Sequence, residues 1–173
     1  MKKGVLKIVF AVLIFLPVCA NATIVKDFNE NGTIQFGDYY DLVNIWDSAI
    51  VTMTGGEVLY LYSYGSSTFN LQDGFINKAL DARNSSVMNL FGGSEPFTLT
   101  AYDSSVVNIY GYGFVVDYIG IKGFWANGDP LSIILRPYSG TYPHVILHEI
   151  PEPNSIVILL SGVLFAVRKY HKT

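Results

Sequence analysis

Apolar and polar residues alternate along most of this chain, in short runs that are separated by turn residues. Four segments share one pattern of turn and alternation, and they read DSAIVTMTGG from Asp47, GSSTFNLQDG from Gly65, NSSVMNLFGG from Asn84 and DSSVVNIYGY from Asp103. The spacing between their starts is nearly constant. Alternation with a period of two is typical of strands, and recurrence at a fixed spacing is typical of stacked repeats. Residues 31–113 are therefore predicted to form about four β-repeats.

The repeats align into columns of similar residues. Two apolar residues follow each turn, two positions apart: Val51 and Met53, Phe69 and Leu71, Met88 and Leu90, Val107 and Ile109. Two further columns precede the turn: Val43, Leu61, Leu80 and Leu99, then Ile45, Ser63, Ala82 and Ala101. Strand side chains alternate between faces, so these columns are predicted to point inward. Asn70, Asn89 and Asn108 lie between the inward pairs and are predicted to form a hydrogen-bonded ladder.

Each repeat supplies one strand before the turn and one after it, and a single unit cannot bury its apolar face alone. The predicted fold is all-β, a short parallel β-solenoid of about four coils. An antiparallel sandwich is the alternative, because closely and regularly spaced turn signals also suit that architecture. The match in residue type down each column favours the solenoid.

The repeat pattern stops near Val115. The turn residues Asn127-Gly128-Asp129-Pro130 separate two apolar runs and predict a hairpin, and a third strand is expected from His144 to Glu149. Residues 115–149 are predicted to form a C-terminal antiparallel cap over the open edge of the solenoid. With this cap, the folded domain spans residues 23–150.

Residues 1–22 have the features of a secretory signal peptide. Lys2 and Lys3 precede an apolar run over residues 8–18, and Ala20 and Ala22 form a small-x-small site. Cleavage by signal peptidase after Ala22 and export through the general secretion machinery are expected. An uncleaved anchor helix is one alternative. A lipoprotein signal at Cys19, the single cysteine, is another, but Val18 is not the small residue such a signal needs. After cleavage no disulfide is possible.

Residues 151–173 have a different composition. Pro151, Glu152 and Pro153 precede a charge-free run over residues 155–167, and Arg168 and Lys169 follow it. As a helix the run would be about 20 Å long, against about 30 Å for a hydrocarbon core. Basic residues after an apolar run keep that end in the cytoplasm. A C-terminal transmembrane helix is therefore predicted, with a buried core segment as the alternative.

The order and spacing of these residues resemble the PEP-CTERM sorting signal of Gram-negative bacteria. The basic cluster RKYHK is thinner than the consecutive arginines of many members. The resemblance implies an exosortase-like membrane protease as partner, transient anchoring in the inner membrane, and transfer to the cell surface or extracellular matrix. It also implies an association with exopolysaccharide and biofilm. The body resembles, more loosely, the adhesin-like β-repeat proteins that often carry such tails.

Charge and candidate chemistry narrow the function classes. Residues 23–152 hold five Lys/Arg and fourteen Asp/Glu, a net charge of −9, which argues against nucleic acid and anionic membrane surfaces as partners.

His144 and His148 fall in one predicted strand, about 13 Å apart, too far to share a metal ion. Asp81, Arg83 and Asp103 are the nearest approach to a polysaccharide-cleaving cluster, with Asp81 and Arg83 expected to face outward. Acidic turns could offer oxygen ligands to calcium, but no EF-hand pattern is present. We expect no enzyme activity, no cofactor and no metal.

One outward column combines aromatic and basic residues: Trp46, Tyr64, Arg83 and Tyr102. Trp46, Tyr64 and Tyr102 are candidates for stacking on sugar rings, and the alternative is that they stack on one another to stabilise the sheet. The sequence thus predicts an exported, non-enzymatic surface or biofilm-matrix protein whose body is structural or adhesive toward exopolysaccharide. A small polysaccharide-active enzyme delivered by the same route, and a permanently anchored envelope protein, are the alternatives.

Overall fold

The computed structural model describes residues 22–94, 97–136 and 140–152, and almost all of their regular structure is β. The predicted apolar helix and most of the predicted signal peptide lie outside these residues. The strands are β1 (Val25–Phe28), β2 (Gly32–Ile34), β3 (Tyr39–Ile45), β4 (Ile50–Ser63), β5 (Thr68–Ala82), β6 (Val87–Leu90), β7 (Phe97–Ala101), β8 (Val106–Val116), β9 (Gly120–Trp125), β10 (Pro130–Leu135) and β11 (Val145–Glu149). One 3₁₀ turn, η2 (Tyr142–His144), precedes β11.

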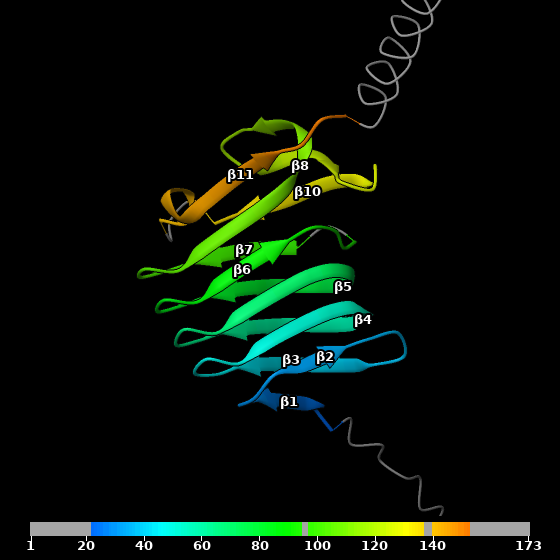
Figure 1. Cartoon of the computed structure of the whole chain (residues 1–173), viewed down its shortest axis with the longest axis vertical. Coiled ribbons are helices and arrows are strands. Elements are labelled where there is room, and N and C mark those ends of the chain that lie inside the picture. The colour runs from blue at the N-terminus through cyan, green and yellow to red at the C-terminus, as the bar shows by residue number, and fades with distance from the viewer. Residues whose placement is uncertain (1–21, 95–96, 137–139, 153–173) are drawn as a thin grey trace, which may run out of the picture.

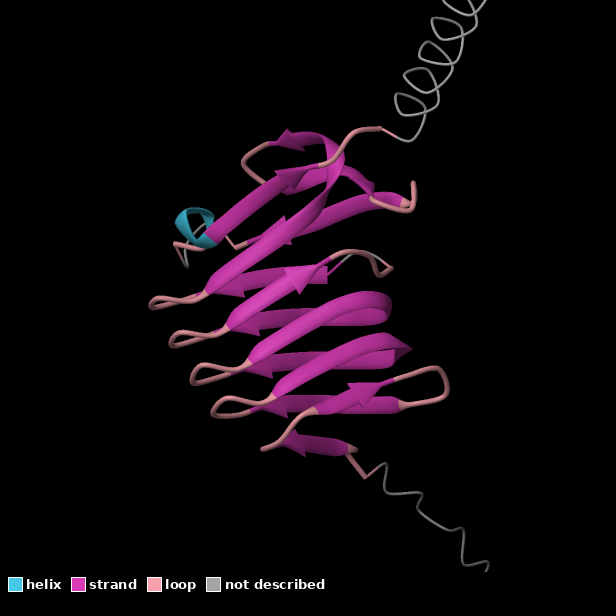
Figure 2. Cartoon of the chain, in the orientation of Figure 1, coloured by secondary structure: helices cyan, strands magenta, loops and turns pink. Residues whose placement is uncertain are grey.

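The strands wind into a parallel β-solenoid of about four turns, with a further pair of strands at each end (Figures 1 and 2). The face formed by strands that precede the Asp/Asn turns, the pre-turn face, runs in the order β1–β3–β4–β5–β7–β10. The post-turn face runs in the order β2–β4–β5–β6–β8–β11. Strands β4 and β5 are long enough to bend from one face to the other. All of these ladder pairings are parallel, so the solenoid prediction is confirmed and the antiparallel sandwich is wrong.

The predicted inward columns form the core. Val51, Phe69, Met88 and Val107 are in register across the post-turn face, and Val43, Leu61, Leu80 and Leu99 across the pre-turn face. All eight side chains are fully buried, as are Ser63, Ala82 and Ala101 in the column of mostly small residues. Each coil thus places its apolar residues over those of the coil below, and burial accumulates along the axis.

The turn that joins the two faces repeats its backbone conformation. Asp47, Asn84 and Asp103 have φ between 58° and 60°, and Gly65 has φ of 66°. Asp and Asn tolerate this left-handed conformation better than other side chains do. The turns also hydrogen-bond to one another, since the N–H groups of Ser66, Ser85 and Ser104 each donate to the carbonyl of the turn residue one coil below. The backbone ladder therefore continues around this corner.

The C-terminal region differs from the predicted antiparallel cap. The hairpin across residues 127–130 is confirmed, because β9 pairs antiparallel with both β8 and β10. However, β10 pairs parallel with β7, and β11 pairs parallel with β8. Strands β10 and β11 thus continue the two faces of the solenoid, with Leu135 directly over Leu99. The repeat does not end at residue 113. The inserted β9 hairpin breaks the spacing that would have revealed the additional coil.

The predicted third strand is also shifted by one residue. It begins at Val145, and His144 belongs to the 3₁₀ turn η2. A connection of this kind is needed because the chain must cross from the end of β10 to the post-turn face before β11 can pair with β8. Thr141, which is buried beside η2, ties the connection to the body by accepting a hydrogen bond at Oγ1 from the N–H of Ala101.

The N-terminal end carries a charge at a core position. Lys26 is in register with Val43, so it occupies the column that is apolar in the coils above. Its Nζ lies 4.9 Å from the centre of the Phe28 ring, which is buried. An inward-pointing charge on an edge strand discourages further strand pairing at that edge. Lys26 therefore closes the N-terminal end of the core without adding an apolar surface.

We predict that Gly65→Ala destabilises the solenoid more than Gly140→Ala does. Both glycines have nearly the same φ, 66° and 68°, so both variants carry a similar backbone cost of about 1–2 kcal/mol. A Cβ on Gly65 would lie 2.8 Å from the carbonyl oxygen of Asp47, whereas one on Gly140 would meet nothing within 4 Å. The additional cost at Gly65 should be roughly 1–3 kcal/mol. Urea unfolding of the two variants measures the difference, and equal midpoints would contradict the tight stacking of the turns.

Candidate functional site

The outward column predicted from the sequence is a continuous stack on the pre-turn face. We call Trp46, Tyr64, Arg83 and Tyr102 the aromatic column. The rings of Trp46 and Tyr64 are nearly parallel, with centroids 4.3 Å apart. The guanidinium carbon of Arg83 lies 5.8 Å from the Tyr64 ring and 5.3 Å from the Tyr102 ring. These distances fit aromatic stacking and cation–π contact, so the members stabilise one another.

Asp81 and Tyr62 extend this site beside the aromatic column. The Nη2 of Arg83 donates to Oδ2 of Asp81 at 3.3 Å, and the Arg83 side chain remains 43 % exposed. Asp81 takes the outward direction predicted for it but is only 9 % exposed. The Tyr62 ring lies edge-on to Tyr64, with the Arg83 guanidinium 5.9 Å away. Arg83 is thus held by one carboxylate and three tyrosines.

This geometry limits what the site can do chemically. Trp46 and Tyr64 cover each other's faces, so a sugar ring cannot stack between them. The column instead presents ring edges, the exposed part of Arg83 and two tyrosine hydroxyls. Within the described residues, neither the Tyr64 nor the Tyr102 hydroxyl takes part in a hydrogen bond, so both can bond to a ligand. Burial, followed by the charge of Asp81, raises the pKa of Tyr62 and so disfavours its phenolate form.

The post-turn face carries the predicted asparagine ladder. Nδ2 of Asn89 donates to Oδ1 of Asn70, and Nδ2 of Asn108 donates to Oδ1 of Asn89, each at 2.9 Å. Nδ2 of Asn70 continues the series downward to Oγ1 of Thr52 at 3.4 Å. At the upper end His148 Nε2 lies 3.0 Å from Oδ1 of Asn108. The ladder is therefore confirmed and runs in one direction across the solenoid.

Sequence reasoning missed the role of His148. Its ring stacks on Tyr110 with centroids 4.4 Å apart, and Tyr110 stacks on Phe91 at the same distance. The parallel register places His148 directly over Tyr110, and this pairing was hidden by the inserted hairpin. The matching aromatic residues at positions 91 and 110, one repeat apart, were the available signal.

Other candidate groups are held separately. His144 Nδ1 lies 2.9 Å from the carbonyl oxygen of Ser105, whereas His148 contacts the side chain of Asn108, so the two imidazoles have different partners. In the turn before β10, Asn127 and Asp129 bond to each other at 2.7 Å. Among residues 22–94, 97–136 and 140–152, no group of three or more His, Cys, Asp and Glu side chains is arranged to hold a metal ion.

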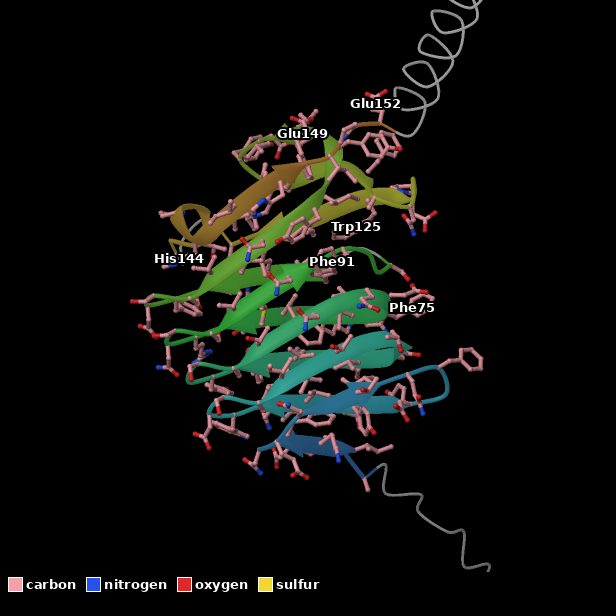
Figure 3. The ribbon with its side chains drawn as sticks, in the orientation of Figure 1. Phe75, Phe91, Trp125, His144, Glu149 and Glu152 are labelled. Atoms are coloured by element: carbon pink, nitrogen blue, oxygen red, sulfur yellow. The ribbon has the colours of Figure 1, made fainter. Side chains whose placement is uncertain are left out.

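The residues predicted to form the sorting signal are described only in part. Pro151 and Glu152 are exposed and follow Ile150, whose N–H donates to the carbonyl of Gly111 at 2.8 Å. Figure 3 shows Glu149 and Glu152 at the end of the solenoid where the chain leaves it. Ala22 is exposed at the other end of the described chain. Ala20, Pro153, Arg168 and Lys169 lie outside the described residues, within which no helix is long and apolar enough to cross a membrane.

Comparison of this chain with known protein families, with curated proteins and with solved structures finds no match.

Raising the pH should destabilise the fold through Tyr62. Its pKa is raised above 10.0 in the folded state, so as the pH climbs past 10 the unfolded chain loses this proton first. Because the unfolded state then binds fewer protons, the free energy of unfolding falls as the pH rises. Tyr62→Phe removes this contribution and should flatten the decline above pH 10 in urea unfolding. Tyr118→Phe, at an exposed loop, is the matched variant and should leave the decline as in the wild type. Identical pH dependence in all three proteins would show that Tyr62 contributes nothing.

Proposed function

We propose that this protein is an exported, non-enzymatic cell-surface or biofilm-matrix protein. Its β-solenoid is the structural or adhesive body, and its C-terminal segment is a PEP-CTERM sorting signal that is handled by an exosortase-like membrane protease. After cleavage of the signal peptide, the tail holds the protein in the inner membrane until the protease releases it or transfers it.

The observation that carries this proposal is the junction between body and tail. Backbone pairing of the solenoid continues to Ile150, which bonds to Gly111, and the Pro-Glu-Pro triplet begins at the next residue. Pro151 cannot donate to a further ladder bond, so the triplet ends the sheet and leaves its first two residues exposed. A protease at the membrane would meet an exposed Pro151 and Glu152 directly after a rigid, folded cargo.

The aromatic column supports an adhesive role of a specific kind. Trp46 and Tyr64 stack on each other, so we propose that contact with a polysaccharide uses the Tyr64 and Tyr102 hydroxyls and the exposed part of Arg83. Such groups bond to sugar hydroxyls while the body keeps its shape. This contact would add to the sorting role and does not depend on any catalytic group.

We predict two processing events that intact mass can detect. Protein recovered from culture fluid or the cell surface should begin at Thr23 and lack the residues that follow the Pro-Glu-Pro triplet. Cells without the protease should instead accumulate a membrane species that begins at Thr23 and still ends at Thr173. Recovery of only the tail-bearing species from cells that have the protease would identify a plain membrane anchor and contradict the sorting role.

The adhesive role predicts that Tyr64→Phe combined with Tyr102→Phe weakens retention on exopolysaccharide. These changes keep the rings, and hence the stack, while they remove the two hydroxyls. A loss of two hydrogen bonds worth about 1 kcal/mol each corresponds to a dissociation constant that is roughly 30-fold larger. Tyr110→Phe is the control because Tyr110 stacks on the opposite face. Equal retention of wild type, double variant and control would exclude the aromatic column as the binding surface.

A further inference from the structure

The last residues of β8 and the connection to β9 expose apolar side chains at the end of the solenoid where the chain leaves it. We call residues 115–119 the hairpin tip. Tyr118 is 83 % exposed, Val115 61 %, Val116 50 % and Ile119 44 %. None of these four side chains belongs to the buried core or to the residues packed against it. Exposed apolar residues gathered in one segment make this segment a candidate contact surface.

The hairpin tip lies at the same end of the solenoid as the exit of the tail. Strand β11 pairs with β8 up to Glu149 and Gly111, and the N–H of Gly113 donates to Oε1 of Glu149 at 3.2 Å. Val115 is two residues beyond Gly113 along β8. Figure 1 shows the end of β8 and the end of β11 at the same end of the molecule. The exit and the hairpin tip thus face the same way along the axis of the solenoid.

The sequence limits how far this surface can be from the apolar run. Only residues 151–154 separate Ile150 from the charge-free segment that starts at Ser155. The five Cα–Cα steps from Ile150 to Ser155 span at most about 18 Å even when fully extended. If the proposed function is right and residues 155–167 enter a bilayer, the exit end of the solenoid must lie within that distance of the lipid surface.

We propose that the hairpin tip rests on the lipid surface of the membrane that holds the tail, so that the solenoid stands upright on its C-terminal end. This inference rests on the anchored stage of the proposed function. It assigns the exposed apolar residues an occupant, the interfacial layer of the bilayer, which no sorting motif requires.

The chemistry of the exit end suits neutral lipid headgroups. Tyr118 is of the amphipathic aromatic type that is enriched at membrane interfaces, and the valines and isoleucine add apolar area. Of the nearby charges, Asp117 lies 3.9 Å from Lys122, and Glu149 bonds to a backbone N–H. Glu152 is exposed and would be repelled by anionic lipid. Zwitterionic lipid, such as phosphatidylcholine, is therefore the expected contact.

The two ends of the solenoid differ in a way that agrees with this orientation. At the N-terminal end Lys26 occupies a core position, and Asp27 and Glu30 lie on the same terminal coil. Burying these charges in a membrane interface would be costly. The N-terminal end also exposes an apolar side chain, Phe36, so the direct connection to the tail is what selects the exit end for lipid contact.

Fluorescent labels at single thiols test the proposal in the tail-bearing protein. In a Cys19→Ser background, Tyr118→Cys labels the hairpin tip and Leu159→Cys labels the tail. Phe36→Cys is the matched control, an exposed aromatic position on the N-terminal coils. Four inter-strand steps separate β2 from β8, roughly 19 Å. Each protein is reconstituted into phosphatidylcholine vesicles and exposed to iodide in water or to nitroxide-bearing lipid.

We expect the labels at 118 and 159 to lose quenching by iodide and to gain quenching by nitroxide lipid, while the label at 36 remains open to iodide. If the label at 159 is quenched by nitroxide lipid and iodide quenches the label at 118 as strongly as the label at 36, the lipid contact is wrong and the anchoring stands. If 36 and 118 are both protected, the solenoid lies flat and the upright orientation is wrong. If 159 stays in water, the tail does not insert, and both the anchoring and the lipid contact fail.

Discussion

In-register stacking of parallel coils is the constraint on which the rest of this structure depends. Each coil must place a residue of the same kind over the residue below. Inward side chains pack on one another in a narrow core, and outward side chains stack on or hydrogen-bond to the equivalent side chain of the next coil. Leu61, Leu80 and Leu99 show this inside, and Asn70, Asn89 and Asn108 show it outside. Stability in such an array is a sum of nearest-neighbour terms, so the loss of one matched position affects the coils on both sides.

The same constraint shapes the surface that would meet a ligand. Stacking places Trp46 against Tyr64 and Arg83 between Tyr64 and Tyr102, which uses the ring faces to hold neighbouring coils together. The second stack, from Phe91 through Tyr110 to His148, does the same on the opposite face. What remains outward is a regular array of ring edges, hydroxyls and amides. A surface of this kind suits many weak contacts with a repetitive polymer better than one deep pocket.

The repetition stops at the two ends of the solenoid, and the proposed sorting and membrane contact depend on these ends. The N-terminal end closes the core with Lys26 over Phe28. The C-terminal end continues the ladder through β11 and then passes to Pro151 without a spacer. A body that is rigid up to the sorting triplet fixes the distance between the solenoid and whatever holds the tail. The proposed sorting and the proposed orientation at the membrane thus both depend on a single junction.

The sequence by itself determined the repeat, the inward columns, the asparagine ladder and the aromatic column, because side chains that alternate between the two faces of a strand make register readable from spacing alone. It also located the hairpin turn at residues 127–130. It could not show that β10 and β11 rejoin the two faces, that His148 completes both the asparagine ladder and the second stack, or that the Trp46 and Tyr64 faces cover each other. Those features arise from contacts between segments separated by an insertion or from side-chain orientation, and only tertiary packing decides them.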